Sequence, residues 1–584
     1  MPLIPIPKKI ESMNKSEKYI FNKLKRLYME ESSISYLYLE PKIKNLTPDF
    51  ILIDPIRGVL IIEVKAWGLD YIDTINEKEV KTIDGNTLEN PAYKARRYFN
   101  KMQGLLYFYD ELVDKGKLNF KLHSIVTMTE LTKQETIDKS IDNFFDHYPA
   151  RVVYKNELSN LELSSLFNND IKVIDSSIID TIRVAIFPEI KIIHRASNNT
   201  SLSELDKKIS ALDFEQERFI KSLSLGHYMI TGIPGSGKTV ALLSRALYLA
   251  RLHKDWKILI VTYNKSLKSQ LKLRIDTIKE ELDYIDVSLD NIEVTNFHQL
   301  AMRYSSLSPR DFNDRSDEFW RDILPNDAIA HVTPEYNAIL IDEYQDFYKN
   351  WFQLILKLMI KYKEEDKEYL NLFLAGDRLQ SIYNPREINW KKDIGLDMRG
   401  RAKLLKTSYR ITKEHIELGL LLLQNDAKYK KEVEEFYEQG KDIFLKNMTE
   451  DSIEIIQSNY KNLSTIIENL LEKYNYNDIL LLAPTWSSIN NIKVLLPYEI
   501  QKNIISSKDI NENKMIFSTY HSSKGIEAKV ALVVDIDKVQ ERKLIYVALT
   551  RASHKVILHS QNFDRSYISK EIYNLIDDRN LAIS

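Results

Sequence analysis

Cysteine is missing from this chain of 584 residues. Disulfides and thiolate-ligated zinc or iron–sulfur centres are therefore excluded, and a reducing compartment is expected. Long apolar runs are missing as well, because no stretch reaches the roughly 18 residues that a membrane-spanning helix requires. Residues 1–10 contain prolines and no apolar run typical of a signal peptide. We therefore expect a cytoplasmic protein that does not associate with membranes.

An excess of charge of one sign is also missing. The 82 lysines and arginines nearly balance the 84 aspartates and glutamates, which leaves a formal net charge of −2. Binding to nucleic acid, if it occurs, must therefore use local basic patches and not a basic chain as a whole. The length exceeds what one hydrophobic core can hold and predicts about three or four domain-sized units.

Glycine is scarce, yet three of the 15 glycines fall within eight residues. The segment Gly232–Thr239 fits the phosphate-binding loop pattern GxxxxGK[ST]. An apolar segment at 228–230 precedes it and a helical pattern at 240–250 follows it, which is the strand, loop and helix that this loop requires. The three glycines are Gly232, Gly235 and Gly237.

This loop predicts a nucleotide site. Its glycines allow backbone N–H groups to surround phosphate oxygens at the positive end of the following helix. Lys238 is expected to reach the β- and γ-phosphates, and Thr239 is expected to hold magnesium. A glycine-rich turn that only caps a helix is the alternative.

A second pattern strengthens the first. The apolar run 338–341 delivers Asp342 and Glu343 at its C-terminal end. An ATPase needs one carboxylate that holds magnesium and a neighbour that activates water. We therefore predict ATP and magnesium as cofactors.

The N-terminal part carries a different group of charges. Two apolar runs flank the turn Asp54–Gly58 and predict a hairpin centred on Ile56. In that hairpin Asp49 lies opposite Glu63, about 5 Å away on the same face. Lys65, two residues beyond Glu63, points to that face as well.

Two carboxylates and an ammonium at the end of an apolar hairpin are costly unless they coordinate a ligand. Asp49 and Glu63 can bind magnesium, and Lys65 can orient or deprotonate an attacking water. Glu17, on a helix expected from about residue 15 to residue 28, is a candidate for a further ligand. A structural ion pair at a strand end is the alternative.

These residues resemble the PD-(D/E)xK nuclease superfamily through Pro48-Asp49 and Glu63-Val64-Lys65. The pair Asn90-Pro91 is similar to the nuclease-related NERD branch of that superfamily. The resemblance implies magnesium-dependent DNA cleavage with the two carboxylates and the lysine as catalytic residues. The next helix, around Tyr93–Tyr107, interleaves basic and aromatic residues that can contact a DNA backbone, although a solvated helix face is equally compatible.

Residues 212–553 resemble superfamily 1 helicases of the UvrD/Rep type. The resemblance rests on Gln216, the phosphate loop, Asp342-Glu343, Leu374–Tyr383, Thr407–Arg410, Thr519–Glu527 and Tyr546–Ala552. It implies that Gln216 reads adenine and that Gln380 and Arg410 contact the γ-phosphate. It further gives Glu527 a ribose contact and Arg551 the role of an arginine finger.

If this resemblance holds, Lys238, Arg410 and Arg551 converge on one triphosphate and neutralise its transition-state charge. ATP then lies between two RecA-like cores, and its hydrolysis opens and closes the cleft. The sequence departs from the helicase pattern at Asn384–Arg386, where a glycine and a base-stacking aromatic are usual. Tyr383 and Trp390 are the candidates for that stacking residue.

We therefore predict an α/β chain of four parts. Residues 1–135 form a restriction-endonuclease-like α/β domain and 136–205 a connecting region. Residues 206–385 and 386–584 form two RecA-like parallel-sheet cores with reduced accessory inserts.

The function expected from these parts is an ATP-dependent DNA translocase or helicase coupled to a metal-dependent nuclease, in bacterial anti-phage defence or DNA repair. Its partner is DNA, single-stranded or with single-stranded ends, and the resemblance implies 3′ to 5′ polarity. A protein partner or a homo-oligomer stays open. The alternative is an ATP-gated DNA sensor whose N-terminal domain does not cleave.

Overall fold

The structure is a computed structural model. It describes residues 3–7, 13–43, 46–147, 149–167, 172–187, 190–192, 210–263, 265–283, 289–308, 310–311, 316–364, 367–382, 388–439, 444–447, 452–506 and 514–577. No helix within these ranges is long and apolar enough to cross a membrane. Residues 193–209, near the end of the expected connecting region, lie outside the described residues.

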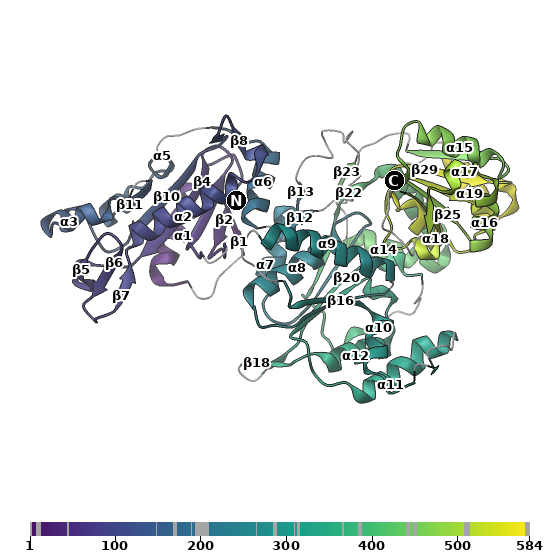
Figure 1. Ribbon diagram of the computed structural model, residues 1–584, viewed down its shortest axis with the longest axis horizontal. Helices are drawn as coiled ribbons and strands as arrows, with labels where there is room; N and C mark the ends of the chain where they lie inside the picture. The colour runs from purple at the N-terminus through teal and green to yellow at the C-terminus, as the bar shows by residue number, and fades with distance from the viewer. Residues whose placement is uncertain are drawn as a thin grey trace. The chain divides into compact units, whose positions relative to one another are not determined.

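The chain divides into two compact units (Figure 1). Unit 1 comprises Met1–His194, Leu202–Ser224 and Ile278–Ser288. Unit 2 comprises Arg195–Ser201, Leu225–Thr277 and Leu289–Ser584. The short stretch 202–224, which the sequence pattern assigned mainly to the first ATPase core, thus groups with the N-terminal part.

Unit 1 is built on a mixed six-stranded sheet with the order β1-β2-β3-β4-β10-β11. The strands are β1 (Leu3–Ile6), β2 (Ser35–Leu39), β3 (Phe50–Asp54), β4 (Gly58–Lys65), β10 (Leu122–Met128) and β11 (Ala150–Val153). Strands β2, β3 and β4 form an antiparallel meander, whereas β4, β10 and β11 run parallel. The turn between β3 and β4 requires glycine, because Gly58 has φ +109° and a Cβ there would lie 2.2 Å from the Lys121 carbonyl oxygen.

Helices cover both faces of this sheet. Side chains of α1 (Lys15–Leu27) pack with Leu60 and Ile62 of β4, whereas side chains of α2 (Pro91–Leu106) pack with Val126 and Met128 of β10. Because alternate residues of a strand point to opposite faces, Glu63 faces the α2 side. The remaining elements of unit 1 are β5 (Ile72–Ile75), β6 (Glu79–Thr82), β7 (Thr87–Glu89), β8 (Val113–Asp114), β9 (Lys117–Leu118), α3 (Lys133–Asp138), α4 (Lys155–Ser159), α5 (Leu163–Leu166), α6 (Ser176–Ile186), β12 (Lys191–Ile192), β13 (Ser210–Ala211) and α7 (Phe214–Ser222).

A buried ion network explains why α7 belongs to unit 1. Glu217 of α7 is fully buried and accepts hydrogen bonds of 2.7 Å from Arg183 of α6 and from Lys221. The Tyr38 hydroxyl of β2 donates to the same carboxylate at 3.0 Å. Burial raises the pKa of Glu217, but the charges of Lys221 and Arg183 outweigh it and hold this pKa below its usual value. Removing one partner of such a network typically costs about 3–5 kcal/mol.

Unit 2 contains two six-stranded sheets, and both are entirely parallel. The first has the order β16-β15-β17-β20-β14-β21. Its strands are β14 (His227–Gly232), β15 (Ile258–Thr262), β16 (Ile292–Asn296), β17 (Ala338–Asp342), β20 (Asn371–Gly376) and β21 (Ala402–Leu405). Strand β21 thus completes the first sheet although it lies beyond residue 385, where the first core was expected to end.

The helices that accompany the first sheet are α8 (Lys238–Leu252), α9 (Lys265–Asp283), α10 (Phe297–Tyr304), α11 (Leu324–His331) and α12 (Lys349–Leu358), and a small hairpin is formed by β18 (Tyr362–Glu364) and β19 (Lys367–Tyr369). Apolar residues of β15, β17 and β20 pack with α10, α11 and α12 in one core. Strands buried on both faces are typical of parallel sheets.

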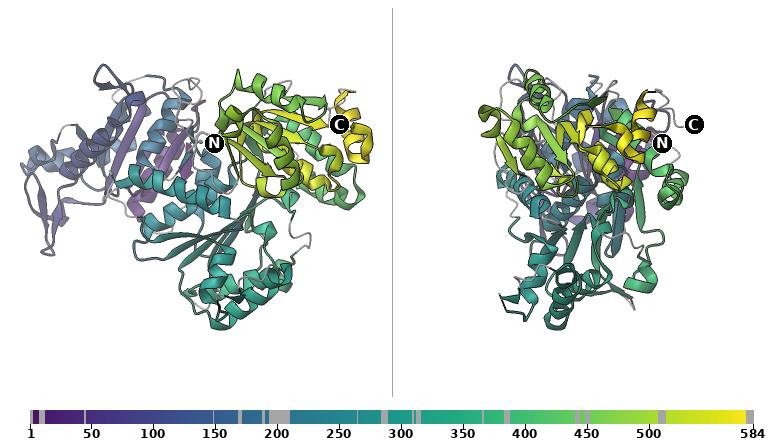
Figure 2. Two further views of the ribbon diagram at one scale, coloured as in Figure 1. Left: turned by 45° about the vertical axis from the view of Figure 1, so that its right-hand side comes forward. Right: turned by 90° about the vertical axis from the view of Figure 1, so that its right-hand side faces the viewer.

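The second sheet has the order β24-β29-β28-β25-β27-β26 and carries helices on both faces (Figure 2). Its strands are β24 (Ile453–Gln457), β25 (Ile479–Ala483), β26 (Ile504–Ser506), β27 (Met515–Thr519), β28 (Ala528–Val534) and β29 (Ala552–Ser560). The accompanying elements are α13 (Lys413–Gln424), α14 (Ala427–Gln439), α15 (Asn462–Leu471), α16 (Trp486–Leu495), α17 (Tyr498–Gln501), α18 (Arg542–Leu549), α19 (Tyr567–Asp577) and the pair β22 (Thr407–Thr412) and β23 (Phe444–Asn447). The predicted α/β class with parallel sheets is confirmed.

Candidate functional sites

The predicted phosphate loop lies between β14 and α8. Gly235 has φ +72° and Gly237 has φ +83°, a backbone conformation that residues with a Cβ rarely adopt. Gly237 is the N-cap of α8, and Lys238 is the first residue of that helix. The loop therefore has the strand, turn and helix N-terminus that favour binding of a phosphate.

Polar contacts tie this loop to the end of β17. The Lys238 ammonium donates to the carbonyl oxygens of Gly232 at 2.9 Å and Ile233 at 3.0 Å, and its burial lowers the pKa of Lys238. The Thr239 hydroxyl donates to Asp342 at 2.9 Å. A hydroxyl and a carboxylate in contact beside a phosphate-binding helix form a donor set that fits magnesium.

The two carboxylates at the end of β17 differ in their surroundings. Burial, and then the charge of Glu343, raises the pKa of Asp342 to about 7. Burial also acts on Glu343, but the charges of Lys524 and Lys238 outweigh it and lower the pKa of Glu343. Glu343 has φ +56°, a strained backbone conformation for a residue that is not glycine. Neighbouring carboxylates with opposite pKa shifts are typical of a catalytic site.

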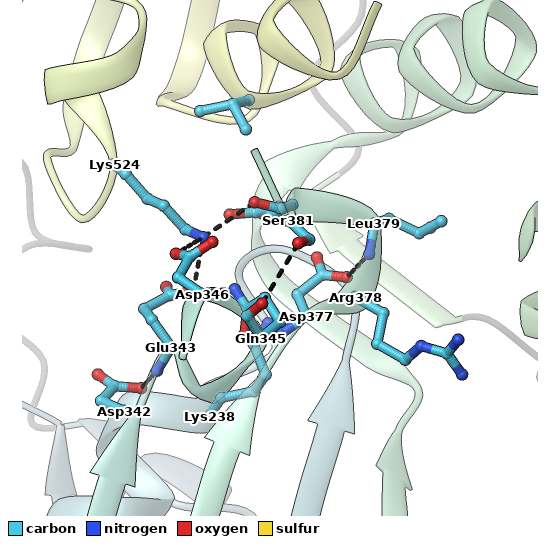
Figure 3. Close-up of polar contacts among 12 residues, drawn as sticks. Lys238, Asp342, Glu343, Gln345, Asp346, Asp377, Arg378, Leu379, Ser381 and Lys524 are labelled. Carbon is cyan, nitrogen blue, oxygen red and sulfur yellow. Dashed lines mark hydrogen bonds and ion pairs between the residues drawn. The ribbon is translucent and has the colours of Figure 1, made fainter. Parts of the chain in front are cut away.

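A lysine that the sequence pattern did not single out completes this cluster (Figure 3). The Lys524 ammonium lies 2.5 Å from Asp346 Oδ2 and 3.4 Å from Glu343 Oε2. It also donates to the Gln380 carbonyl oxygen at 2.9 Å. Lys524 is 2% exposed and Asp346 is fully buried. The sequence feature that points to Lys524 is its position inside Thr519–Glu527, one of the segments that resemble helicases.

Gln345 and Asp377 were missed as well. The Gln345 side chain donates to Glu343 and accepts the backbone N–H of Asp377 at 3.1 Å. Burial raises the pKa of Asp377 to about 6, although the Lys238 charge opposes the rise. Gln345 therefore joins the ends of β17 and β20 beside the loop.

The predicted arginines come from the part of unit 2 that follows residue 400. Arg551 donates to the Gln380 side-chain oxygen at 3.0 Å, and Arg410 forms an ion pair with Glu527. Burial, and then the charge of Arg410, lowers the pKa of Arg551 to about 10. The Arg410 charge also acts on Lys238. The structure thus brings Lys238, Arg410 and Arg551 into one neighbourhood.

Three further candidates are Gln216, Trp390 and Tyr383. Gln216 belongs to α7 of unit 1, where its backbone N–H donates to Asp213 at 2.8 Å. Trp390 packs edge-on against Tyr344 and Phe352, with ring centroids 5.7 and 5.1 Å apart, and so belongs to the first core of unit 2. Tyr383 and the departure at 384–386 lie outside the described residues.

The N-terminal candidate site is formed by the hairpin of β3 and β4. Its register pairs Phe50 with Ile62 and Asp54 with Gly58, which is the symmetry about Ile56 that the sequence predicts. Asp49 Oδ2 accepts the backbone N–H of Val64 at 2.5 Å.

The expected charges meet at this hairpin end. The Lys65 ammonium lies 2.7 Å from Glu63 Oε1, so Lys65 and Glu63 share a face. Burial, and then the charge of Glu63, raises the pKa of Asp49 to about 7. Lys94 of α2, which the sequence pattern placed only on a basic and aromatic helix, also lies 2.7 Å from Glu63 Oε1.

One observation tests whether this site suits a divalent cation. Glu63 is fully buried, and its Oε2 has no hydrogen-bond partner among the described residues. A buried carboxylate oxygen without a partner is costly unless a ligand satisfies it. Asp49 and Glu63 therefore fit a metal through two carboxylates.

The expectation for Glu17 needs correction. Its carboxylate accepts the backbone N–H of Asn14 at 2.9 Å in a capping box at the start of α1. The described residues contain no group of three or more histidine, aspartate or glutamate side chains that could hold a metal. The charge of Glu17 still contributes to the raised pKa of Asp49, but the structure does not give Glu17 the place of a third ligand.

Helix α2 uses much of its basic and aromatic character internally. Arg97 forms an ion pair of 2.8 Å with Glu89, and the Tyr98 hydroxyl donates to the Thr47 carbonyl at 3.2 Å. Arg96 and Lys101 are exposed. Only part of this helix is therefore available as a surface for DNA.

A phosphate loop, a carboxylate pair at the end of another strand of the same sheet and two parallel sheets in one unit define the class of P-loop nucleotide-binding proteins. Comparison with protein families refines this class. Residues 216–386 match the family model of an AAA domain, and residues 514–559 match the UvrD-like helicase C-terminal domain. Over these two regions the chain is thus similar to an AAA domain and to UvrD-like helicases.

Curated relatives agree. Components of the ATP-dependent helicase/nuclease from three bacteria are similar to parts of the chain. The protein of Clostridium acetobutylicum is 34% identical over 18% of this chain and 10% of that protein. The proteins of Listeria welshimeri and Carboxydothermus hydrogenoformans are 31% and 30% identical over 23% and 28% of this chain, and over 10% and 16% of their own lengths. The chain thus spans less than one fifth of each relative.

Solved structures of two viral helicases are similar to this chain only at low TM-scores. The arterivirus nonstructural protein 10 helicase is 12% identical, with 59% of this chain and 61% of that chain covered and a TM-score of 0.31. The PRRSV helicase is 13% identical, with 64% and 62% covered and a TM-score of 0.27.

Proposed function

We propose that the chain is an ATP-driven DNA translocase of the helicase type, coupled to a metal-dependent DNA nuclease. The observation that carries the motor is the set of contacts from the segments beside the second sheet of unit 2 to polar side chains beside the first. Lys524 follows β27 and reaches Glu343 and Asp346, whereas Arg551 precedes β29 and reaches Gln380. A nucleotide site completed from two sheets changes when the sheets move, which is the requirement for a motor.

The residues have distinct roles in ATP hydrolysis. Lys238 and the N–H groups at the start of α8 bind phosphate oxygens. Thr239 and Asp342 would hold magnesium, which neutralises charge on the phosphates when it is bound. Glu343, whose pKa is lowered, accepts a proton from the attacking water.

The arginines act on the transition state. The charge of Arg410 lowers the pKa of Lys238. The charge of Arg551 lowers the pKa of Glu343. Both can therefore neutralise charge that develops on the transferred phosphoryl group. The assignments of Gln216 to adenine and Glu527 to the ribose stay predictions.

The experiment for the motor measures ATP hydrolysis with and without single-stranded DNA, followed by movement along labelled single strands. We expect DNA to stimulate hydrolysis and movement to run 3′ to 5′. A rate of hydrolysis that is independent of DNA, together with no movement in either direction, would contradict the proposal.

The proposed nuclease rests on Asp49, Glu63 and Lys65. The two carboxylates would hold a divalent cation, which activates water and neutralises the phosphate when it is bound. The Lys65 ammonium orients that water, because it is held beside Glu63 at 2.7 Å. The partnerless oxygen of Glu63 supports this assignment.

Cleavage assays with magnesium over single-stranded, duplex and forked DNA test this part. We expect cleavage by the parent chain and its loss in Asp49→Ala, Glu63→Ala and Lys65→Ala. Undiminished cleavage in all three variants would place the nuclease elsewhere.

A second candidate function is an ATP-gated DNA sensor. The observation that favours it is the double ion pair of Glu63, because a carboxylate that two lysines neutralise can serve a structural purpose. In that case the parent chain binds DNA in an ATP-dependent way and leaves it intact with magnesium or manganese. We place this candidate second because a structural pair does not require the partnerless Oε2.

We further propose a role in bacterial anti-phage defence or in DNA repair, in the cytoplasm. Support comes from the bacterial origin of the helicase/nuclease relatives. Plaque assays and survival after ultraviolet irradiation, in cells with and without the gene, separate the two roles.

A further inference from the structure

Glu63 in unit 1 is held by two ammonium groups. Lys65 and Lys94 each place Nζ 2.7 Å from its Oε1. Glu63 is fully buried, whereas the side chains of Lys65 and Lys94 are 23% and 26% exposed. The two cations share one oxygen of the carboxylate, and the other oxygen has no hydrogen-bond partner among the described residues.

Helix α2 holds Lys94 in this position. The fully buried Asn90 caps the helix and donates to the carbonyl oxygens of Asn76 at 3.0 Å and Phe144 at 2.8 Å. One turn later, the Ser124 hydroxyl of β10 donates to the Ala95 carbonyl at 3.1 Å. These contacts fix the start of α2 against the sheet, so Lys94 is a positioned charge and not a mobile surface lysine.

The ring of Tyr98 contributes to the same placement. The Lys94 ammonium lies 5.4 Å from the Tyr98 ring centroid, within the range of a cation–π contact. Tyr98 is itself buried and tied to the Thr47 carbonyl, two residues before Asp49. Lys94 is thus bound on one side by Glu63 and on another by an aromatic ring.

The charges at this site favour a single metal ion. The formal charges of Asp49 and Glu63 balance those of Lys65 and Lys94. One divalent cation gives the site a net charge of about +2 and attracts a phosphodiester. A second divalent cation would be repelled by the first and by the two lysines, in a partly buried site that offers two carboxylates.

We propose that the N-terminal site binds one divalent cation and that the Lys94 ammonium supplies the positive charge that a second metal ion provides in two-metal nucleases. This inference rests on the proposed nuclease function. In the reaction the water oxygen bonds to phosphorus as the bond to the leaving alkoxide breaks. The water loses one proton to solvent, the alkoxide takes one up, and Lys94 stabilises the negative phosphoryl oxygens without a change in its own protonation.

The test combines metal binding with cleavage in the full-length chain. Mn²⁺ is titrated calorimetrically without nucleotide, and the binding that disappears in Asp49→Ala is assigned to this site. We expect one Mn²⁺ per chain. In Lys94→Ala and Lys94→Gln we expect Mn²⁺ affinity to rise about tenfold, because a neighbouring positive charge is gone, and cleavage to fall about 10²- to 10³-fold.

Controls separate charge from folding. Lys94→Arg keeps the charge and should retain the parent Mn²⁺ affinity. Arg96→Ala removes an exposed charge from the same helix and should leave both Mn²⁺ affinity and stoichiometry unchanged. Lys94→Gln keeps much of the aliphatic part of the side chain. Thermal unfolding checks that each variant is folded.

The outcomes distinguish this inference from the nuclease proposal. Two Mn²⁺ ions at the parent site, or parent-like affinity and cleavage in Lys94→Ala and Lys94→Gln, would overturn the role of Lys94 alone. Absence of Mn²⁺ binding would overturn both proposals. One bound Mn²⁺ whose affinity rises in Lys94→Ala, without cleavage of any DNA, would remove the nuclease function and support the charge sharing.

Discussion

Replacing Lys524 by methionine removes one of the cations that join the two sheets of unit 2. Lys524 is 2% exposed and pairs with Asp346 at 2.5 Å and with Glu343 at 3.4 Å. Methionine fills a similar volume, so the main effect is electrostatic. Asp346 is fully buried and would lose its ammonium partner in a medium of low polarity.

The magnitude follows from this burial. Breaking a buried ion pair from one side costs about 3–5 kcal/mol, because the remaining charge is uncompensated. At about 2–4 °C per kcal/mol for a domain of 150–250 residues, the midpoint of unfolding should fall by about 6–20 °C, and the larger size of unit 2 favours the lower half. The double variant Lys524→Met with Asp346→Asn also removes the buried carboxylate charge that lost its ammonium partner, and it should recover more than half of the loss.

Differential scanning calorimetry of the full-length chain measures these shifts. Lys529→Met is a matched control, because its ion pair with Asp478 is longer, at 3.5 Å, and Lys529 is 31% exposed. That control should cost less than about 1 kcal/mol. The reasoning fails if Lys524→Met costs no more than Lys529→Met, or if the double variant is less stable than Lys524→Met.

Further predictions concern each site. Lys238→Ala should cut ATP hydrolysis strongly, and Glu343→Gln should keep ATP binding while blocking hydrolysis; parent rates in either variant would refute the site. Asp49→Ala and Lys65→Ala should abolish cleavage and spare DNA-stimulated ATPase, which paired assays on one preparation check. The isolated protein should move on single strands but unwind long duplexes poorly, with a grip that weakens steeply with salt; processive unwinding of a blunt kilobase-scale duplex by the monomer would contradict this. Burial, and then the Lys265 charge, lowers the pKa of His298 to about 4, so its stabilising contribution is complete above pH 6.5 and falls as pH drops from 6.5 to 4; the pH dependence of unfolding should weaken in that window in His298→Phe.

The sequence predicts those parts of the sites that are close along the chain. The hairpin register follows from two apolar runs of equal length around a turn, so Glu63 and Lys65 could be assigned to one face in advance. The phosphate loop is equally local, because the glycines with positive φ and the first turn of α8 lie within eight residues. Local patterns of this kind fix geometry without knowledge of distant packing.

Contacts between distant segments could not be predicted in the same way. Lys524 and Asp346 are 178 residues apart, and their pairing depends on how the two sheets of unit 2 pack. Lys94 reaches Glu63 because Asn90 fixes the start of α2 through the carbonyls of Asn76 and Phe144. The periodicity of the sequence does not predict how α2 is oriented against the sheet.

The expected domain borders differ from the structure for the same reason. Strand β21 follows residue 385, yet it pairs with β14 in the first sheet. Met229 and Ala402 are neighbours in that pairing. Helix α7 carries Gln216, which the resemblance to helicases assigns to adenine, yet Glu217 of the same helix is bound by Arg183 of α6. A motif identifies the chemistry of a segment, whereas burial decides which unit the segment packs with.

Both candidate sites share one feature: a buried carboxylate forms an ion pair with a lysine from a separate segment. Glu63 of β4 receives Lys94 from α2, and Asp346 after β17 receives Lys524 after β27. Such a lysine places an opposite charge against a carboxylate that is removed from solvent. The protein's own cations therefore lie against these carboxylates. We expect a metal ion at either site to serve the proposed reaction, and the two lysines to limit how much additional positive charge each site accepts.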